Sequence, residues 1–217
     1  MTNSRANVQT APATSGVAMR KAARAALITG LLISAAGCVK FGAEPPDRLL
    51  AIASTATVPA GVSASSASES ALFIDVPNVP KALATPRVAV RENSTSFAYV
   101  KDAIWVDTPA RQFQSLLSET IRSRSNILVL DPGQYLARTG YILNGDLVEF
   151  GIDATRREAV VTFDATMLSP DGLTVTRQRF TASAPVSRID ADGVAPAISA
   201  AANDVANAVA TWVSSRT

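Results

Sequence analysis

Residue types that commonly do chemistry are scarce in this chain of 217 residues. The sequence contains no histidine and one cysteine, Cys38. Without histidine, the commonest general base and the commonest zinc ligand are both missing. No segment has the GxxxxGK[ST] spacing of a phosphate-binding loop, so we expect no ATP hydrolysis by this chain itself. The sequence therefore argues against an enzyme, including a lipoprotein hydrolase, and predicts no cofactor and no metal site.

The acidic residues do not change this interpretation. Asp146 and Glu149 are three positions apart, and on a regular strand their side chains would face opposite sides of the sheet. Asp190 and Asp192 lie beside Gly193, but their spacing fits no complete calcium loop. We interpret this second pair as the start of a helix.

The single cysteine follows a short apolar segment. Arg20, Lys21 and Arg24 precede the apolar residues Ala25–Ala36. A membrane-spanning helix needs ~20 apolar residues, so this segment is too short to span a bilayer. A basic head, a short apolar core and small residues before a break are typical of a secretory signal. Because Cys38 has no partner for an internal disulfide, attachment of a lipid explains it best.

The four residues Ala35-Ala36-Gly37-Cys38 resemble a bacterial lipobox, although Ala35 stands where leucine is usual. In that motif the cysteine carries acyl chains such as palmitate and becomes the first residue after cleavage. The resemblance implies a signal peptide over residues 1–37, with Met19 as an alternative start, and a lipidated tether over residues 38–47. An ordinary cleaved signal with an incidental cysteine is the alternative.

The charge and length of the chain after the signal indicate what kind of domain it forms. The precursor has 20 basic and 18 acidic residues, and four of the basic ones lie before Cys38. The mature chain therefore has a small negative net charge and no basic footprint for nucleic acid. Its length is sufficient for one domain with a substantial core, which we place at residues 48–217.

Alternating and apolar segments predict a sheet with a long hairpin. Two long alternating segments flank the turn Ser169–Gly172 and predict this hairpin. Within residues 97–106 we expect a break near Lys101–Asp102, and Gly145 suggests a bulge. The predicted strands are Arg48–Ala53, Ala71–Val76, Arg87–Arg91, Phe97–Val106, Ile127–Leu130, Tyr141–Phe150, Ala159–Leu168 and Leu173–Phe180.

Two segments predict helices. Thr108-Pro109 is a typical helix start, and an apolar stripe of Phe113, Leu116, Leu117 and Ile121 follows it. The second helix runs from about Val194 to Ser214, with its apolar residues on one face. Together the elements predict an α/β (α+β) fold, in which two main helices pack on a mixed, largely antiparallel sheet in a single domain. The apolar face of the second helix comprises Val194, Ile198, Ala201, Val205, Val209, Trp212 and Val213.

Several short motifs resemble the ABC-type transport auxiliary lipoprotein family. The segment Val76–Leu83 (VPNVPKAL) is similar to the family's V-x-x-V-P-x-x-L, and the strand Pro86–Arg91 (PRVAVR) follows it. Trp105–Pro109 (WVDTP) is similar to the Trp-x-acidic-x-Pro start of the family's first helix. Tyr141–Phe150 (YILNGDLVEF) is similar to a family strand that closes on an acidic residue and phenylalanine. The resemblance extends from about Leu49 to Trp212.

This resemblance implies a partner and a location. Family members look like periplasmic lipoprotein partners of ABC systems with MCE-type substrate-binding subunits, which move lipids between membranes. The resemblance thus implies a membrane anchor at Cys38, an MCE-domain partner and, as an open question, a homo-oligomer. Val39 follows the cysteine in place of the aspartate of an inner-membrane retention signal, which favours the periplasmic face of the outer membrane. A lipoprotein of an outer-membrane assembly or lipopolysaccharide-export machine is the alternative.

The candidate partner contacts lie in two segments. Tryptophan is enriched at interface anchors and proline-rich loops are preorganised, so we expect contacts from Trp105 and from Val79, Pro80 and Leu83. In the alternative interpretation, Trp105 packs beneath the first helix and the proline segment only connects two strands.

Overall fold

The sheet is organised around one long strand, β5 (Tyr141–Asp153), to which three other strands pair. The computed structural model describes residues 48–61, 63, 65, 71–130, 133 and 139–217. These residues belong to one compact unit, Pro46–Thr217. Within them the sheet has seven strands, and the other six are β1 (Leu72–Ile74), β2 (Arg87–Arg91), β3 (Phe97–Ile104), β4 (Val129–Leu130), β6 (Glu158–Leu168) and β7 (Val175–Pro185).

The two edges of β5 are used differently. Along one edge β5 pairs with β6 in antiparallel fashion over its whole length, and β6 pairs in the same way with β7. The other edge is shared, because β1 pairs in parallel with its first residues and β2 with its last. β4 adds to β1 in parallel, and β3 to β2 in antiparallel fashion. The sheet is mixed and largely antiparallel, as the sequence predicts.

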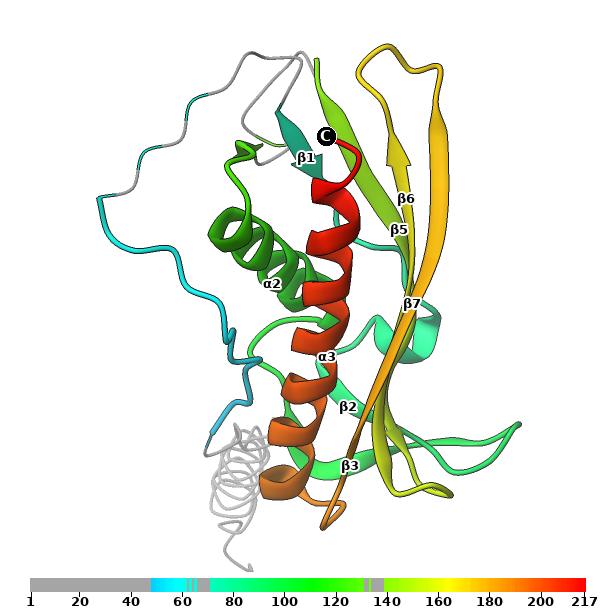
Figure 1. Ribbon diagram of the computed structural model, residues 1–217. Coiled ribbons are helices and arrows are strands. Elements are labelled where there is room, and N and C mark those ends of the chain that lie inside the picture. The colour runs from blue at the N-terminus through cyan, green and yellow to red at the C-terminus, as the bar shows by residue number, and fades with distance from the viewer. Residues whose placement is uncertain (1–47, 62, 64, 66–70, 131–132, 134–138) are drawn as a thin grey trace, which may run out of the picture. The chain divides into compact units, whose positions relative to one another are not determined.

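The two long helices lie on the same side of the sheet (Figure 1). Helix α2 (Pro109–Arg124) follows Thr108, and helix α3 (Ala191–Ser214) begins after Asp190, whose side chain accepts a 2.8 Å hydrogen bond from the Gly193 N–H. Both starts were predicted. No helix in the described part of the chain is long and apolar enough to cross a membrane.

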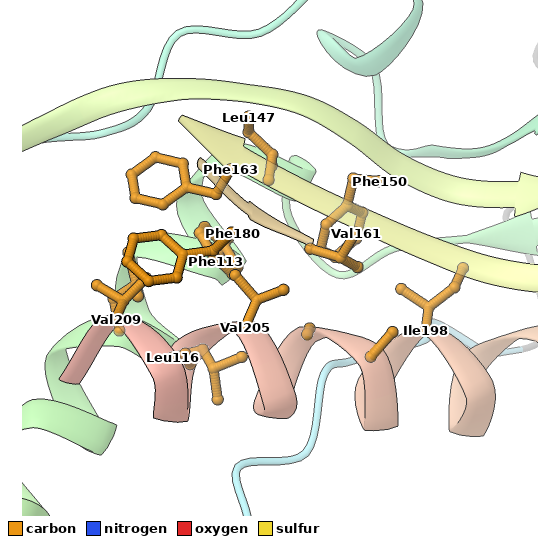
Figure 2. Close-up of a cluster of buried hydrophobic side chains, with 14 of the residues drawn as sticks. Phe113, Leu116, Leu147, Phe150, Val161, Phe163, Phe180, Ile198, Val205 and Val209 are labelled. Carbon is orange, nitrogen blue, oxygen red and sulfur yellow. The ribbon is translucent and has the colours of Figure 1, made fainter. Parts of the chain in front are cut away.

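The core lies between these helices and the sheet. The Phe113 ring meets the Phe163 ring edge to face, with centroids 5.2 Å apart. All the residues predicted on the apolar stripes of the two helices are buried. Figure 2 shows side chains of α2 and α3 facing those of the sheet, among them Phe113, Leu116, Ile198, Val205 and Val209 from the helices and Leu147, Phe150, Val161, Phe163 and Phe180 from the strands.

The strand predicted over Arg48–Ala53 is wrong. Only Leu50 pairs with the sheet, through a single parallel bridge to Trp105. Beyond Leu50 the backbone is bound by side chains of the helices instead of a neighbouring strand. Ile52 N donates to Gln112 Oε1 at 3.0 Å, and Asn203 bonds both Ala53 O and Thr55 N at 2.8 and 2.9 Å. These side chains satisfy backbone N–H and C=O groups of the segment, so the segment does not need to pair with a neighbouring strand.

The irregularities of the sheet are only partly as predicted. The break in β3 is confirmed: Asp102 has a φ of 56°, and the β2–β3 register shifts between Arg87 and Ala89. The bulge in β5 is not at Gly145, because the register with β6 shifts between Leu147 and Glu149. Gly145 serves a close approach, since a Cβ there would lie 2.1 Å from Asp164 O.

Candidate docking groove on the open face of the sheet

The bulge in β5 decides which side chains lie on the sheet face opposite the helices. Leu147 and Phe150 both point into the core, although they are three positions apart, because Val148 is the extra residue. Asp146 and Glu149 therefore lie on the same, open face. The prediction that these two carboxylates face opposite sides is wrong for this reason.

The segment between β1 and β2 crosses to that open face. It first continues beside β5, where Asn78 N donates to Gly145 O at 2.9 Å and Leu147 N donates to Asn78 O at 2.8 Å. Pro80 then precedes the short 3-10 helix η3 (Lys81–Leu83). Tyr99 Oη on β3 donates to Ala82 O at 3.2 Å and holds η3 against the strands.

A groove of about 360 Å³ lies between η3 and the open face. Two apolar side chains on its wall are exposed: Phe97 at the start of β3 is 56% exposed, and Val148 in the bulge is 37% exposed. Val160 of β6 contributes a buried part of the lining. The groove is thus mainly apolar, and its residues are Pro80, Ala82, Leu83, Ala89, Arg91, Phe97, Val148–Asp153, Val160, Thr162 and Arg179.

Charged side chains in the groove are paired with one another. Arg91 bonds Glu149 at 2.6 Å and Asp153 at 2.8 Å. Thr162 Oγ1 donates to Glu149 Oε2 at 2.8 Å. The N–H of Arg156 bonds the Asp153 carboxylate and, with Arg91, lowers the pKa of that carboxyl against the opposing effect of burial. Arg179, which also lines the groove, balances the second carboxylate, so the lining has no net formal charge.

A second ionic cluster continues along the open face from β6 to β7. Asp164 is buried, and Arg179 bonds its two oxygens at 2.6 and 2.7 Å, which lowers the pKa of the carboxyl despite its burial. Arg177 bridges Asp164 at 3.2 Å and Asp146 at 3.3 Å. These bonds hold the floor of the open face in one arrangement, so the groove is preformed.

The predicted contact residues differ in how far they are exposed. Trp105 is only 1% exposed and its ring meets Phe150 edge to face at 6.0 Å, so its side chain belongs to the core and offers no contact surface. Leu83 is also buried, with 4% exposed, because it anchors η3. Val79 is half-buried against the core, whereas Pro80 is exposed and lines the groove. Cys38 and its tether lie outside the described residues.

Sequence reasoning missed the main features of the groove. The sequence predicts strands that contain Phe97, Val148 and Arg91, but it does not predict that these residues share a groove. The one available signal was the i, i+3 spacing of Asp146 and Glu149, which a bulge makes compatible with a shared face.

Solved structures share this fold. Protein XCC0632 from Xanthomonas campestris, described as a member of the DUF330 family, matches with a TM-score of 0.59 and 21% identity over 66% of this chain and 83% of that one. An uncharacterized protein matches with a TM-score of 0.57 and 14% identity over 66% and 92% of the two chains. At these identities the likeness concerns the fold alone. No curated protein matches the chain significantly.

A match to a protein family covers most of the chain. The family model described as the ABC-type transport auxiliary lipoprotein component matches residues 53–210. The matched range begins just beyond Leu50 and ends within α3, so it includes the seven described strands, all of α2, most of α3 and the groove. The chain belongs to the ABC-type transport auxiliary lipoprotein component family.

Proposed function

We propose that this protein is the auxiliary, docking component of an ABC-type transport system that moves lipid between membranes, with an MCE-domain subunit as its partner. The observation that carries the proposal is the family match over residues 53–210, which places the described domain in a family of transport-associated lipoproteins. The MCE partner and the lipid cargo come from the resemblance described above for the sequence motifs.

In this proposal the anchor lies at Cys38. Acyl chains attached there contribute ~0.8 kcal/mol per buried CH₂ group, so several chains hold the protein permanently at a membrane. Val39 directly follows the cysteine, which supports retention at the periplasmic face of the outer membrane. The domain would then meet a partner that reaches it across the periplasm.

The groove on the open face is the proposed docking surface. Aromatic side chains that insert into a partner contribute much of the binding energy at interfaces, and Phe97 is available for this role. Binding there would order few new groups, because ion pairs and Tyr99 already fix the floor and η3. The paired charges around Arg91 form a polar rim suited to a partner with an apolar contact residue.

We propose a role without catalysis for this surface. The carboxylates of the open face are held by arginines, and the pKa of Asp164 and of Asp153 is lowered rather than raised toward neutrality. A general acid or base working near pH 7 would need the opposite shift. Turnover of ester or phosphate substrates by the purified full chain would contradict this part of the proposal.

Co-purification from cells tests the partner. The full precursor with a C-terminal tag is expressed in a Gram-negative host, crosslinked in the cells and purified. We expect an MCE-domain protein together with its permease and ATPase. Recovery of a barrel protein or an assembly machine would instead favour the outer-membrane assembly or lipopolysaccharide-export alternative.

Two variants separate the anchor from the docking surface. Cys38→Ala should release the protein from the membrane fraction. Phe97→Ser combined with Val148→Ser should leave the protein folded and anchored, because both side chains are exposed, but should reduce partner recovery at least tenfold. Val175→Ser, at an exposed valine outside the groove, is the matched control and should retain the partner. If the Phe97→Ser/Val148→Ser variant and the Val175→Ser control recover equal amounts of the partner, the groove is not the docking surface.

A further inference from the structure

The described chain starts at one defined end of the domain. Arg48 forms an ion pair with Asp192 in the first turn of α3. Leu50 N donates to Ile104 O and Val106 N donates to Leu50 O, both at 2.7 Å. We name this region the anchor-proximal end and define it by Arg48, Leu49, Val106, Arg156, Arg157, Arg188 and Ile189.

The opposite end is the β6–β7 turn, Ser169–Thr174. β7 has 11 residues and leads from this turn toward the start of α3. At ~3.3 Å per residue, the strand separates the two ends by roughly 36 Å. The turn and the start of α3 lie at opposite ends of the domain in Figure 1.

The length of chain before Arg48 limits how far the domain can stand from a lipid on Cys38. The positions of Cys38 and Arg48 in the sequence allow a span of at most ~36 Å when fully extended. This maximum is about equal to the length of the domain along β7. If Cys38 is lipidated, as the proposed function requires, the anchor-proximal end is therefore the part held nearest to the bilayer.

Exposed apolar side chains gather at this end. Leu49 is 51% exposed, Val106 is 56% exposed and Ile189 is 39% exposed. Leu50 pairs in parallel with Trp105, so Leu49 and Val106 lie diagonally on the same side of this pairing, and the ion pair of Arg48 holds the segment near the start of α3. Such side chains gain free energy when they enter the boundary between headgroups and acyl chains.

Basic side chains lie at the same end, close in sequence to the segment that contains Ile189. The turn that contains Arg156 and Arg157 is joined to the β7–α3 connection, because Arg157 Nη2 donates to Ser187 O and Val186 N donates to Arg157 O, both at 2.9 Å. Arg188 bonds Asp190 at 3.5 Å, but within the described residues neither Arg156 nor Arg157 pairs with a carboxylate. Both guanidinium groups are exposed, and although Arg157 uses one N–H on Ser187 O, both can still meet anionic headgroups.

The backbone of Arg157 has a φ of 56°, in the left-handed region that glycine or asparagine usually occupies in turns. Glycine can therefore replace this arginine without backbone strain, which makes it the substitution with which to test the side chain.

We propose that the anchor-proximal end binds the surface of an anionic phospholipid bilayer. Leu49, Val106 and Ile189 enter the headgroup region, while Arg156 and Arg157 contact the anionic headgroups. The domain thereby stands upright on its membrane, with the β6–β7 turn pointing away and the open-face groove directed sideways. The inference rests on the proposed anchor, but it does not depend on which protein the groove binds.

Site-specific fluorescence on the lipidated full chain tests this orientation. Since acylation consumes the thiol of Cys38, Ile189→Cys and Leu173→Cys each introduce a single free thiol for an environment-sensitive dye. Each protein is inserted into vesicles of phosphatidylcholine and phosphatidylglycerol, with or without headgroup-quenching nitroxide lipid. We expect strong quenching and a blue shift at position 189 and neither at 173, although Leu173 is the more exposed residue at 85%.

Removal of the two arginines provides the second comparison. Arg156→Gln with Arg157→Gly preserves the turn, because glycine suits a positive φ. Each basic residue near an anionic surface contributes about fivefold to binding, so the pair should lower the docking equilibrium constant, measured from the quenching at position 189, by about 25-fold in phosphatidylglycerol vesicles. The same loss should appear for the unmodified protein at 1 M salt.

The outcomes are distinguishable from those of the proposed function. Equal quenching at positions 189 and 173 in floated, anchored protein would overturn the orientation while leaving the anchor intact. Protection at 189 only after addition of an MCE-domain protein would show a protein interface and also overturn it. Failure of the chain to float with vesicles at all would contradict the proposed anchor instead.

Discussion

Asp164 is the residue around which the polar interactions of the open face are arranged. It is buried on β6, which lies between β5 and β7, and Arg179 and Arg177 of β7 form ion pairs with it. The side chains of Arg179 and Arg177 remain 62% and 59% exposed, so a buried carboxylate is paired with two largely solvated arginines. The arrangement lets β6 carry a charge at its centre without leaving that charge unpaired.

Substitution of Asp164 should reveal this role through its pH dependence. The pKa of Asp164 is lower in the folded chain than its usual value of 3.8. Its contribution to the free energy of unfolding is therefore present above about pH 4 and is lost as the pH falls through the folded-state pKa. Asp164→Asn should lower that free energy by roughly 1–3 kcal/mol at pH 7 and by less at pH 3.

Urea unfolding at the two pH values measures this difference. Asp204→Asn is the matched control, since Asp204 is exposed on α3 and makes no described ion pair, and it should change little at either pH. A deficit for Asp164→Asn of the same size at pH 7 and pH 3 would show that its packing, rather than its charge, stabilises the fold.

At the scale of elements, periodicity identified most of the fold and local context decided the rest. The helices and the β6–β7 hairpin were predictable, because their apolar residues recur with the period of the element that contains them. The bulge at Val148 was not predictable. A bulge depends on how two strands pair, and the sequence of β5 alone does not determine its register with β6. The groove depends on that bulge and on η3, so its position was beyond sequence reasoning.

The segment Arg48–Ala53 and the residue Trp105 show the same limit. An apolar run of six residues fits a strand, yet here hydrogen bonds from side chains of α2 and α3 bind its backbone. Trp105 has the residue type of an interface anchor, but its side chain is buried and its ring packs edge to face against Phe150. Residue type alone could not distinguish these alternatives.

Asn203 should control the attachment of the N-terminal segment to the helices. Its buried amide donates to Ala53 O at 2.8 Å and accepts from Thr55 N and Thr55 Oγ1 at 2.9 Å. Asn203→Ala should lower the free energy of unfolding by roughly 1–3 kcal/mol and speed proteolysis within residues 51–58. Limited proteolysis followed by mass spectrometry measures the second effect.

Asn207→Ala, one turn further along α3, provides the comparison. The side chain of Asn207 makes no hydrogen bond to the described N-terminal segment, so this variant should be cleaved at the rate of the unmodified protein. Unchanged cleavage of Asn203→Ala would mean that packing of Ile52 and its neighbours, rather than the amide, attaches the segment.

At the scale of the whole molecule, the proposed membrane attachment and the proposed partner contact lie on different parts of one domain. The helices bury one face of the sheet, the opposite face has a preformed groove with Phe97 at its wall, and the end near Arg48 leads toward the anchor. A transport auxiliary component needs both a fixed attachment and an accessible contact surface. In this arrangement the two lie on separate parts of the surface, so that neither obstructs the other.

Photocrosslinking in cells tests the central claim most directly. A photoreactive amino acid replaces Phe97 in the groove in one protein and Val175 on the β7 edge in another, each in the tagged full precursor. The account predicts an ultraviolet-dependent adduct with an MCE-domain subunit from position 97 and none from position 175. The absence of that adduct at position 97, or an adduct there with a barrel protein, would contradict it.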